Sequence, residues 1–271
     1  MTKKTLPLIS FEEYISELKY QLESSDDNYE YYYRGCCTDN WIYNLTPGIY
    51  RDSNINNEDI NFREMILRSP SDFVDDKTTL EKLVKMQHYG LPTRLLDITS
   101  NPLVALYFAS IQFKDSKTDG KIYVFKIPIK EMKYYDSDSI ALVSNLSKLR
   151  IDKTDFTSDF GYLMHEIRDE KPQYLDKFEK ENQEDIKKVF LVKVKLNNNR
   201  IVRQSGAFLI FGIEDLSTKK LSAILPSTQI EKEIIIDKVG KGNILKSLKS
   251  LAINEYTLFP ELEHQANFLM K

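Results

Sequence analysis

The sequence is short of the residues that mark several common protein classes. Its 271 residues include two cysteines, three histidines, nine glycines and nine prolines. Because Cys36 and Cys37 are adjacent, a bridge between them would be strained, and we expect both thiols to stay reduced. Two adjacent thiols and three dispersed histidines give no metal-ligand spacing. The few glycines and prolines exclude a fibrous or low-complexity chain, so the sequence predicts a globular protein without a bound metal.

Long apolar runs and a large excess of one charge are also missing. No stretch approaches the roughly 20 apolar residues of a membrane-spanning helix. The apolar run after Lys3 and Lys4 ends too soon for a secretory signal. The formal net charge is −3, which argues against general binding to nucleic acid or to anionic membranes. We therefore expect a cytoplasmic protein with no membrane partner.

Several catalytic signatures are absent as well. The chain has no glycine-rich phosphate loop, no G-x-S-x-G turn, no H-E-x-x-H helix and no internal repeat. Hydrophobic residues make up 41% and charged residues 29%, which is ordinary globular composition. A chain of this length fits one large domain. The function must therefore be sought in less familiar arrangements of polar residues.

Periodicity predicts a mixture of helices and strands. Capping boxes at residues 10–13 and 78–81 begin two helices, a third is expected at 58–68, and the apolar segment 102–113 reads as a central helix. We predict a mixed α/β (α+β) fold for residues 1–271, as a single domain with a mixed central sheet, flanking helices and a polar helical insertion at about 134–188. The expected strands are residues 29–35, 121–128, 189–196, 207–213 and 232–237.

The most apolar part of the sequence also carries the most conspicuous polar side chains. The helix that begins at Thr78 has a buried stripe at helical spacing, which extends to Gln87 and His88 before Gly90 ends the helix. Residues 91–97 read as a turn around Pro92. A buried amide or imidazole costs about 1–3 kcal/mol if it is unpaired, so both side chains need partners close by. They belong either to a satisfied core network or to a site.

Several blocks resemble the FRG domain family. Residues 31–36, "YYYRGC", resemble its aromatic-Arg-Gly signature, and residues 87–109, "QHYGLPTRLLDITSNPLVALYFA", resemble its second block. Residues 164–172, 200–212 and 258–269 resemble later blocks, although Glu261 to His264 depart from the usual Asp and Gly. The resemblance implies a bacterial FRG-type domain over residues 1–271. Because members are often found in mobile-element and phage-defence neighbourhoods, it also implies an effector or toxin role.

One hypothesis places five polar residues of these two blocks in a single cluster around a nucleotide-like ligand: Arg34, Gln87, His88, Arg94 and Asp97. Arg34 lies at a strand end before Gly35, which lets a ligand approach the backbone, so its guanidinium suits a phosphate. His88 suits a ribose hydroxyl or a proton transfer. Structural roles are the alternatives: a sheet-edge Arg34 paired with Glu64, a core His88, and an ion pair between Arg94 and Asp97. The predicted ligand-binding residues in these blocks are Arg34, Gln87, Thr93, Arg94, Asp97 and Tyr107.

A more remote similarity is to ADP-ribosyltransferases, which would make NAD the substrate or cofactor. Arg34-Gly35 resembles their early strand motif, Tyr107-Phe108-Ala109 a second motif, and Glu231-Lys-Glu233 their catalytic glutamates; the Ser-Thr-Ser strand is missing. The resemblance implies that Arg34 holds the pyrophosphate, that a tyrosine stacks on nicotinamide, and that Glu233 or Glu231 stabilises the ribosyl cation. Rival carboxylates are Glu166 and Glu170, whose alternative is an exposed helical surface. The candidate catalytic residues are thus His88, Glu233 and Glu166.

The alternative function is a non-enzymatic regulatory module that binds nucleic acid or protein. Residues 200–212 would then form a strand in which Arg200, Arg203 and Gln204 lie beside Phe208 and Phe211, a combination that can grip single-stranded nucleic acid. A core strand with a basic edge explains the same pattern. The sequence leaves a small-molecule nucleotide, a protein and a nucleic acid as candidate partners.

Overall fold

The computed structural model describes residues 7–23, 26–38, 44–111, 118–150, 156–173, 184–215, 220–221, 230–262, 265–266 and 270. The helices are α1 (Phe11–Glu23), α3 (Glu58–Arg68), α4 (Thr79–His88), α5 (Pro102–Ser110), α6 (Asp138–Asn145), α7 (Phe156–Glu170), α9 (Asn199–Arg203), α10 (Lys241–Ser250) and α11 (Glu255–Leu258). The main-sheet strands are β1 (Tyr29–Cys36), β2 (Leu95–Thr99), β3 (Gly120–Pro128), β4 (Lys133–Tyr134), β5 (Val189–Lys193), β6 (Gly206–Phe211) and β9 (Ile230–Ile236). A small hairpin pairs β7 (Ile213–Asp215) with β8 (Lys220–Leu221), and short 3-10 turns include η1 (Gly48–Tyr50), η2 (Asn54–Asn57), η3 (Pro70–Phe73), η4 (Ile129–Glu131) and η5 (Leu146–Lys148).

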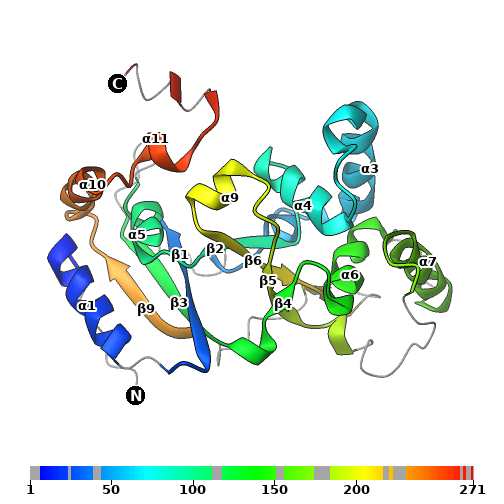
Figure 1. The fold of residues 1–271 in the computed structure, drawn as a ribbon, viewed down its shortest axis with the longest axis horizontal. Coiled ribbons are helices and arrows are strands. Elements are labelled where there is room, and N and C mark those ends of the chain that lie inside the picture. Colours follow the sequence, from blue (N-terminus) through cyan, green and yellow to red (C-terminus); the bar gives the residue numbers. More distant parts are fainter. Residues whose placement is uncertain are drawn as a thin grey trace.

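A seven-stranded mixed sheet runs through the middle of the molecule, as predicted (Figure 1). Its strand order is β4-β5-β6-β2-β1-β3-β9; β4 pairs with β5 in parallel and the other neighbours are antiparallel. The predicted strands at 29–35, 121–128, 189–196, 207–213 and 232–237 are confirmed within a few residues. The fold is therefore a mixed α/β fold.

One central strand differs from the prediction. Leu95–Thr99, expected to lie in a turn, is β2 and pairs with β6 on one side and with β1 on the other. Four of its five residues are buried, and only Asp97 is exposed. Pro92 favours a turn locally, but two distant strands supply the hydrogen bonds that make residues 95–99 extended. The expected turn over residues 91–97 is wrong for its second half.

The two faces of the sheet are covered differently. Side chains alternate along each strand, so Tyr33 points to one face and Tyr32 to the other. The helix-covered face packs against α4, α5 and α6. The loop-covered face packs against the segment of residues 44–57, which includes Ile49 and Tyr50. Polar residues at successive positions of a strand therefore lie on opposite faces of the sheet.

Gly35 has a packing role that the sequence did not predict. It lies inside β1, which continues to Cys36, and it faces α5. A Cβ atom on Gly35 would lie 1.8 Å from the carbonyl oxygen of Ala105. The glycine thus brings the apolar helix α5 against the sheet, whereas we had expected it to let a ligand approach the backbone.

Helix α4 carries the polar residues of interest and has well-defined ends. The side chain and backbone of Thr78 form the predicted capping box with Glu81. At the other end Gly90 has a φ of +87°, and the amide of Leu91 donates to the carbonyl of Met86 at 3.0 Å. This is a Schellman-type ending, which confirms the predicted glycine cap. It fixes the last turn of α4, where Gln87 and His88 lie.

The segment between β4 and β5 is helical where the structure describes it. Helix α6 packs on α4 and the sheet and buries Ile140, Leu142 and Val143 completely, and α7 packs on α6. The sequence also predicts a helix over residues 260–271, of which residues 263–264, 267–269 and 271 lie outside the described residues. Among the helices that the structure does describe, none combines the length and the apolar character needed to cross a membrane.

Candidate ligand pocket at His88

A small pocket lies on the helix-covered face, between the C-terminal end of α4, strand β2 and helix α9, which are neighbours in Figure 1. It encloses about 80 Å³. Its polar lining comes from segments that are far apart in the chain: Gln87, His88, Asp97, Asn198, Arg200 and Gln204. Four of these six, Gln87, His88, Asp97 and Gln204, are among the residues predicted from the sequence.

Gln87 links the helix to the strand. The hydroxyl of Thr93 donates to Oε1 of Gln87, and Nε2 of Gln87 donates to the carboxylate of Asp97 at 2.8 Å. These bonds satisfy both ends of the amide and fix its orientation. They also hold the exposed Asp97 carboxylate at the pocket. The partners that we expected for Gln87 are therefore present.

His88 lies in the same turn and is not fully buried, because 16% of its side chain is exposed. Its Nε2 atom is 3.2 Å from Oε1 of Glu261. Burial lowers the pKa of His88, and Arg200 lowers it further, against the opposing attraction of Glu261. The imidazole is therefore neutral at pH 7, a state in which it accepts or relays a proton.

Arg200 and Gln204 reach the pocket from a helix and its cap, so the predicted strand is wrong for this segment. The side chain of Asn198 accepts a hydrogen bond from the amide of Arg200 at 2.8 Å, which starts α9. The guanidinium of Arg200 lies 4.8 Å from the centre of the Phe259 ring. Nε2 of Gln204 donates to the carbonyl of Leu258 at 3.2 Å. These contacts join the pocket to the segment after α11.

The expected aromatic surface for nucleic acid does not form. Phe208 and Phe211 are buried on opposite faces of β6, at 5% and 2% exposure. Arg203 donates to the carbonyl of Thr257 at 3.2 Å, so it contributes to packing between α9 and α11. Neither phenylalanine is available to stack on a base, which removes the feature on which that interpretation depended.

Arg94 is a structural residue. It is completely buried and pairs with Glu58, whose Oε1 lies 2.9 Å from its Nε; its Nη1 donates to the carbonyl of Phe211 at 3.1 Å. Burial opposes the charge, but the attraction of Glu58 outweighs it and raises the pKa of Arg94. The expected ion pair with Asp97 is wrong, and Arg94 does not line the pocket.

Arg34 lies on the loop-covered face, away from His88. Its Nε donates to the carbonyl of Asn44 at 2.7 Å, and its Nη1 donates to the carbonyl of Asp97 at 2.6 Å. It is not a sheet-edge residue, since β1 lies inside the sheet, and Glu64 pairs instead with Arg68. The five polar residues therefore do not form one cluster. Arg34 instead supports β2, the strand that carries Asp97, from the loop-covered face.

A comparison with models of known protein families finds a match in the N-terminal half of the chain. The family model of the FRG domain matches residues 29–118, about a third of the chain. The chain carries an FRG domain. Neither a curated protein nor a solved structure matches the chain significantly. The FRG segment supplies Gln87, His88 and Asp97, whereas Asn198, Arg200 and Gln204 come from beyond it.

Two further residues predicted to belong to the site, Glu233 and Tyr107, do not line the His88 pocket. Glu233 is on β9, on the loop-covered face, in the same cross-strand row as Tyr123 and Arg34. It pairs with Lys121 at 2.9 Å and is 46% exposed. Tyr107, on α5, is buried, which raises its pKa to about 12. Its ring makes an edge contact with its neighbour in the core rather than facing an open site.

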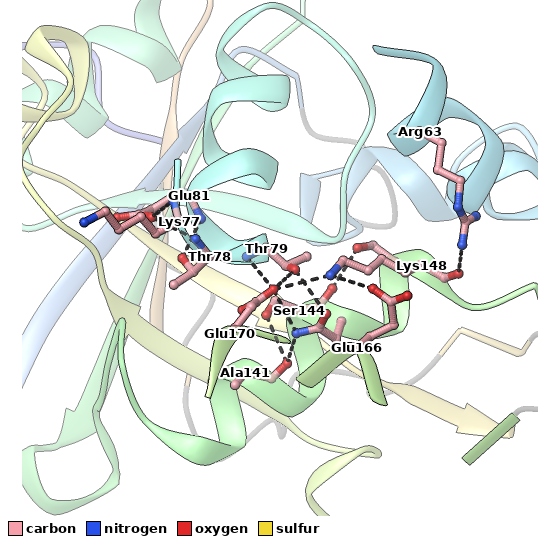
Figure 2. Close-up of polar contacts among 12 residues, drawn as sticks. Arg63, Lys77, Thr78, Thr79, Glu81, Ala141, Ser144, Lys148, Glu166 and Glu170 are labelled. Atoms are coloured by element: carbon pink, nitrogen blue, oxygen red, sulfur yellow. Dashed lines mark hydrogen bonds and ion pairs between the residues drawn. The ribbon is translucent and has the colours of Figure 1, made fainter. Parts of the chain in front are cut away.

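Glu166 and Glu170 belong to a polar cluster at the other end of α4, outside the FRG segment. Figure 2 shows Glu170 between Thr79 and Lys148, with Glu166 on the far side of the same lysine. Oε1 of Glu170 accepts from the amide of Thr79 at 2.9 Å and from Asn145 at 3.3 Å, and Lys148 lies 2.9 Å from Glu166. Exposures of 18% for Glu166 and 7% for Glu170 show that the expected exposed surface is wrong.

Three side chains were not among the predicted site residues: Asn198 and Arg200, which line the pocket, and Glu261, which contacts His88. Arg200 was noted only as part of a nucleic-acid-binding strand, and Glu261 only as a departure from a family block. The sequence signal for both was their position in the later FRG-like blocks. Within the described residues, no three His, Cys, Asp or Glu side chains gather as metal ligands.

Proposed function

We propose that the chain binds a nucleotide-like small molecule at the His88 pocket. The observation that carries this proposal is the convergence of Gln87, His88, Asp97 and Arg200 on one concave site from three separate segments. The pocket alone is too small, since ligand sites usually measure about 300–1,000 Å³. A neighbouring groove of about 310 Å³ shares Val84 and Asn198 with it, so the two together have the volume of a nucleotide site.

NAD is the first candidate substrate, in keeping with the similarity to ADP-ribosyltransferases. In cleavage of its glycosidic bond, the electron pair leaves with nicotinamide and an acceptor oxygen adds to the ribosyl carbon. The fixed Asp97 carboxylate would stabilise the cationic ribosyl group, and the neutral imidazole of His88 would take the proton of the acceptor. Asp97 replaces Glu233 and Glu166 in this proposal because it lines the pocket and they do not.

A nucleotide panel headed by NAD tests this function. A ligand at 100 times its dissociation constant adds about 2.7 kcal/mol to stability, which raises the midpoint of thermal unfolding by several degrees. We expect such a shift with the wild type and its loss in Asp97→Asn and His88→Gln, with free nicotinamide as the product if NAD is consumed. No shift with any nucleotide would contradict the proposal. An effector role in phage defence rests on the family resemblance alone and predicts growth arrest on expression, relieved by the same variants.

A protein-binding regulatory module is the second candidate. Exposed apolar side chains directly follow His88, Ile201 and Glu261 in the sequence: Tyr89 is 67% exposed, Val202 49% and Leu262 83%. Apolar side chains around a polar site suit a protein partner. This candidate predicts no nucleotide shift, and loss of a partner on a Tyr89→Ser substitution. Binding to single-stranded nucleic acid would instead weaken steeply with salt.

A further inference from the structure

Glu261 lies against the pocket in an unusual state. Both of its carboxylate oxygens are buried, yet among the described residues neither accepts a hydrogen bond. The nearest polar contact is His88, 3.2 Å away, and this imidazole is neutral at pH 7 because burial lowers its pKa. Burying a carboxylate without hydrogen bonds is unfavourable. A purely structural contact would leave this charge in water or give it donors.

Arg200, beside His88, is in the complementary state. Its guanidinium stacks on Phe259, and no carboxylate within the described parts of the chain lies at ion-pair distance from it. Arginine presents planar donors that suit a phosphate or a carboxylate. The contrast with Arg94, whose guanidinium is taken up by Glu58 and a backbone carbonyl, is clear. One side of the pocket thus offers donors to an anion that this conformation does not supply.

The segment that carries Glu261 is held next to the pocket by contacts that do not involve its carboxylate. Gln204 binds the carbonyl of Leu258, and the ring of Phe259 packs edge-on against Phe108 with ring centres 6.1 Å apart. Leu262, the next residue after Glu261, is 83% exposed. The backbone is therefore anchored up to Phe259, and the Glu261 side chain can leave His88 without unpacking α11.

We propose that Arg200 and His88 form an anion subsite, that the Glu261 carboxylate closes this subsite on the side of His88, and that a phosphate group of the ligand displaces Glu261 from His88. This inference rests on the proposed function, because it assigns one group of the ligand to one part of the same pocket. The C-terminal segment then competes with the ligand and weakens its binding.

The test uses inorganic phosphate as the probe, with the intact chain at constant ionic strength. The ring signals of the three histidines are followed by NMR and assigned with a His88→Gln variant. We expect phosphate to perturb His88 weakly in the wild type and to bind at least about fivefold more tightly in Glu261→Gln. The matched control is Glu131→Gln, which removes an exposed carboxylate far along the chain and should leave the wild-type affinity unchanged. Acetate at the same concentrations shows whether any carboxylate serves equally.

Two results would overturn the inference. The first is equal phosphate affinity in the wild type and in Glu261→Gln; the second is no perturbation of His88 in either protein. Adding Arg200→Met to Glu261→Gln should abolish the gained affinity, and retention of that affinity would count equally against the subsite. Because phosphate is not a nucleotide, tighter phosphate binding together with a negative nucleotide panel would mean that the subsite exists while the proposed ligand class is wrong.

Discussion

The two ends of helix α4 carry polar clusters of similar composition but opposite character. At the N-terminal end, Glu170 accepts from the backbone and side chain of Thr79, from Asn145 and from Lys148. Its side chain is 7% exposed. At the C-terminal end, His88 lines a pocket and contacts Glu261, whose buried carboxylate oxygens accept no hydrogen bond among the described residues. The same helix therefore begins at a cluster whose polar groups are bonded to one another, which we call the closed end. It ends at a cluster with polar groups that lack partners among the described residues, which we call the open end.

The difference lies in how far each polar group is already bonded. A carboxylate that accepts hydrogen bonds at the first turn of a helix and also pairs with a lysine stabilises the fold. It occupies the donors around it, so they are not available to a ligand. The C-terminal end differs: His88 lines the pocket together with Arg200, which has no acid partner among the described residues, and contacts the Glu261 carboxylate, which accepts no hydrogen bond there. Unsatisfied capacity, rather than the number of polar residues, is what separates a site from a core network.

The largest loss of stability should come from replacing Arg94, whose guanidinium is already paired. Replacing Arg94 by Met leaves Glu58 as an uncompensated buried charge, which typically costs about 3–5 kcal/mol. For a chain of this size that corresponds to a fall of about 10 °C in the midpoint of thermal unfolding. Urea and thermal unfolding would measure both quantities.

The control is the substitution Arg200→Met, because Arg200 has no ion-pair partner among the described residues. Because it breaks no ion pair among the described residues, we expect a loss of less than about 1 kcal/mol. Equal losses for the two variants would show that Arg200 is as structural as Arg94, and the contrast between closed and open polar groups would fail.

A smaller effect is expected from Glu170→Gln at the closed end of α4. The amide keeps the shape but loses the charge that Lys148 and the helix amide contact, so we expect about 2–3 kcal/mol of destabilisation. Glu166→Gln is the matched change, since Glu166 contacts the same lysine from a more exposed position and should cost less than about 1 kcal/mol. Urea unfolding of the pair would decide; a larger loss at Glu166 would contradict the assignment of Glu170 as the anchor of α4.

Local signals predicted most of the fold. The capping boxes at the starts of α1 and α4 and the Gly90 ending of α4 appear in the structure as expected. Alternating residues located β1 and β3, and the apolar segment 102–110 located α5. Each of these features depends on hydrogen bonds or on a burial pattern within a few residues, which a sequence displays directly.

The errors share a cause in distant partners. Strand β2 is extended because β1 and β6 flank it, and no residue of 95–99 reveals that pairing. Arg94 lies three residues from Asp97, yet its partner Glu58 is 36 residues away. Residues 199–203 look like a strand, but the Asn198 cap makes them one helical turn.

The candidate pocket was predicted in part for the same reason. Periodicity within one helix placed Gln87 and His88 on the inward face, and Asp97 is close enough in sequence to be grouped with them. Arg200, which lines the pocket, and Glu261, which contacts His88, lie more than 100 residues further along the chain. Arg34 was wrongly grouped with His88, because the sequence does not reveal that β1 points it to the other face of the sheet.

The smallest effect concerns the charge of His88 at the open end of α4. Its pKa is lowered in the folded protein, so the unfolded chain binds the proton more readily, and stability should fall as the pH drops below about 6.5. The contribution should stay below about 1 kcal/mol, since the side chain is partly exposed and solvent screens it. Urea midpoints of wild type and His88→Gln between pH 5.5 and 7.5 would measure it, with His165→Gln, an exposed histidine of α7, as the control. The stability difference between wild type and His88→Gln should be constant at high pH and should turn against the wild type at low pH. A difference that did not change with pH would contradict the lowered pKa of His88. A difference that turned in favour of the wild type at low pH would mean that Glu261 pairs with a charged His88, which would make the open end of α4 as closed as the other.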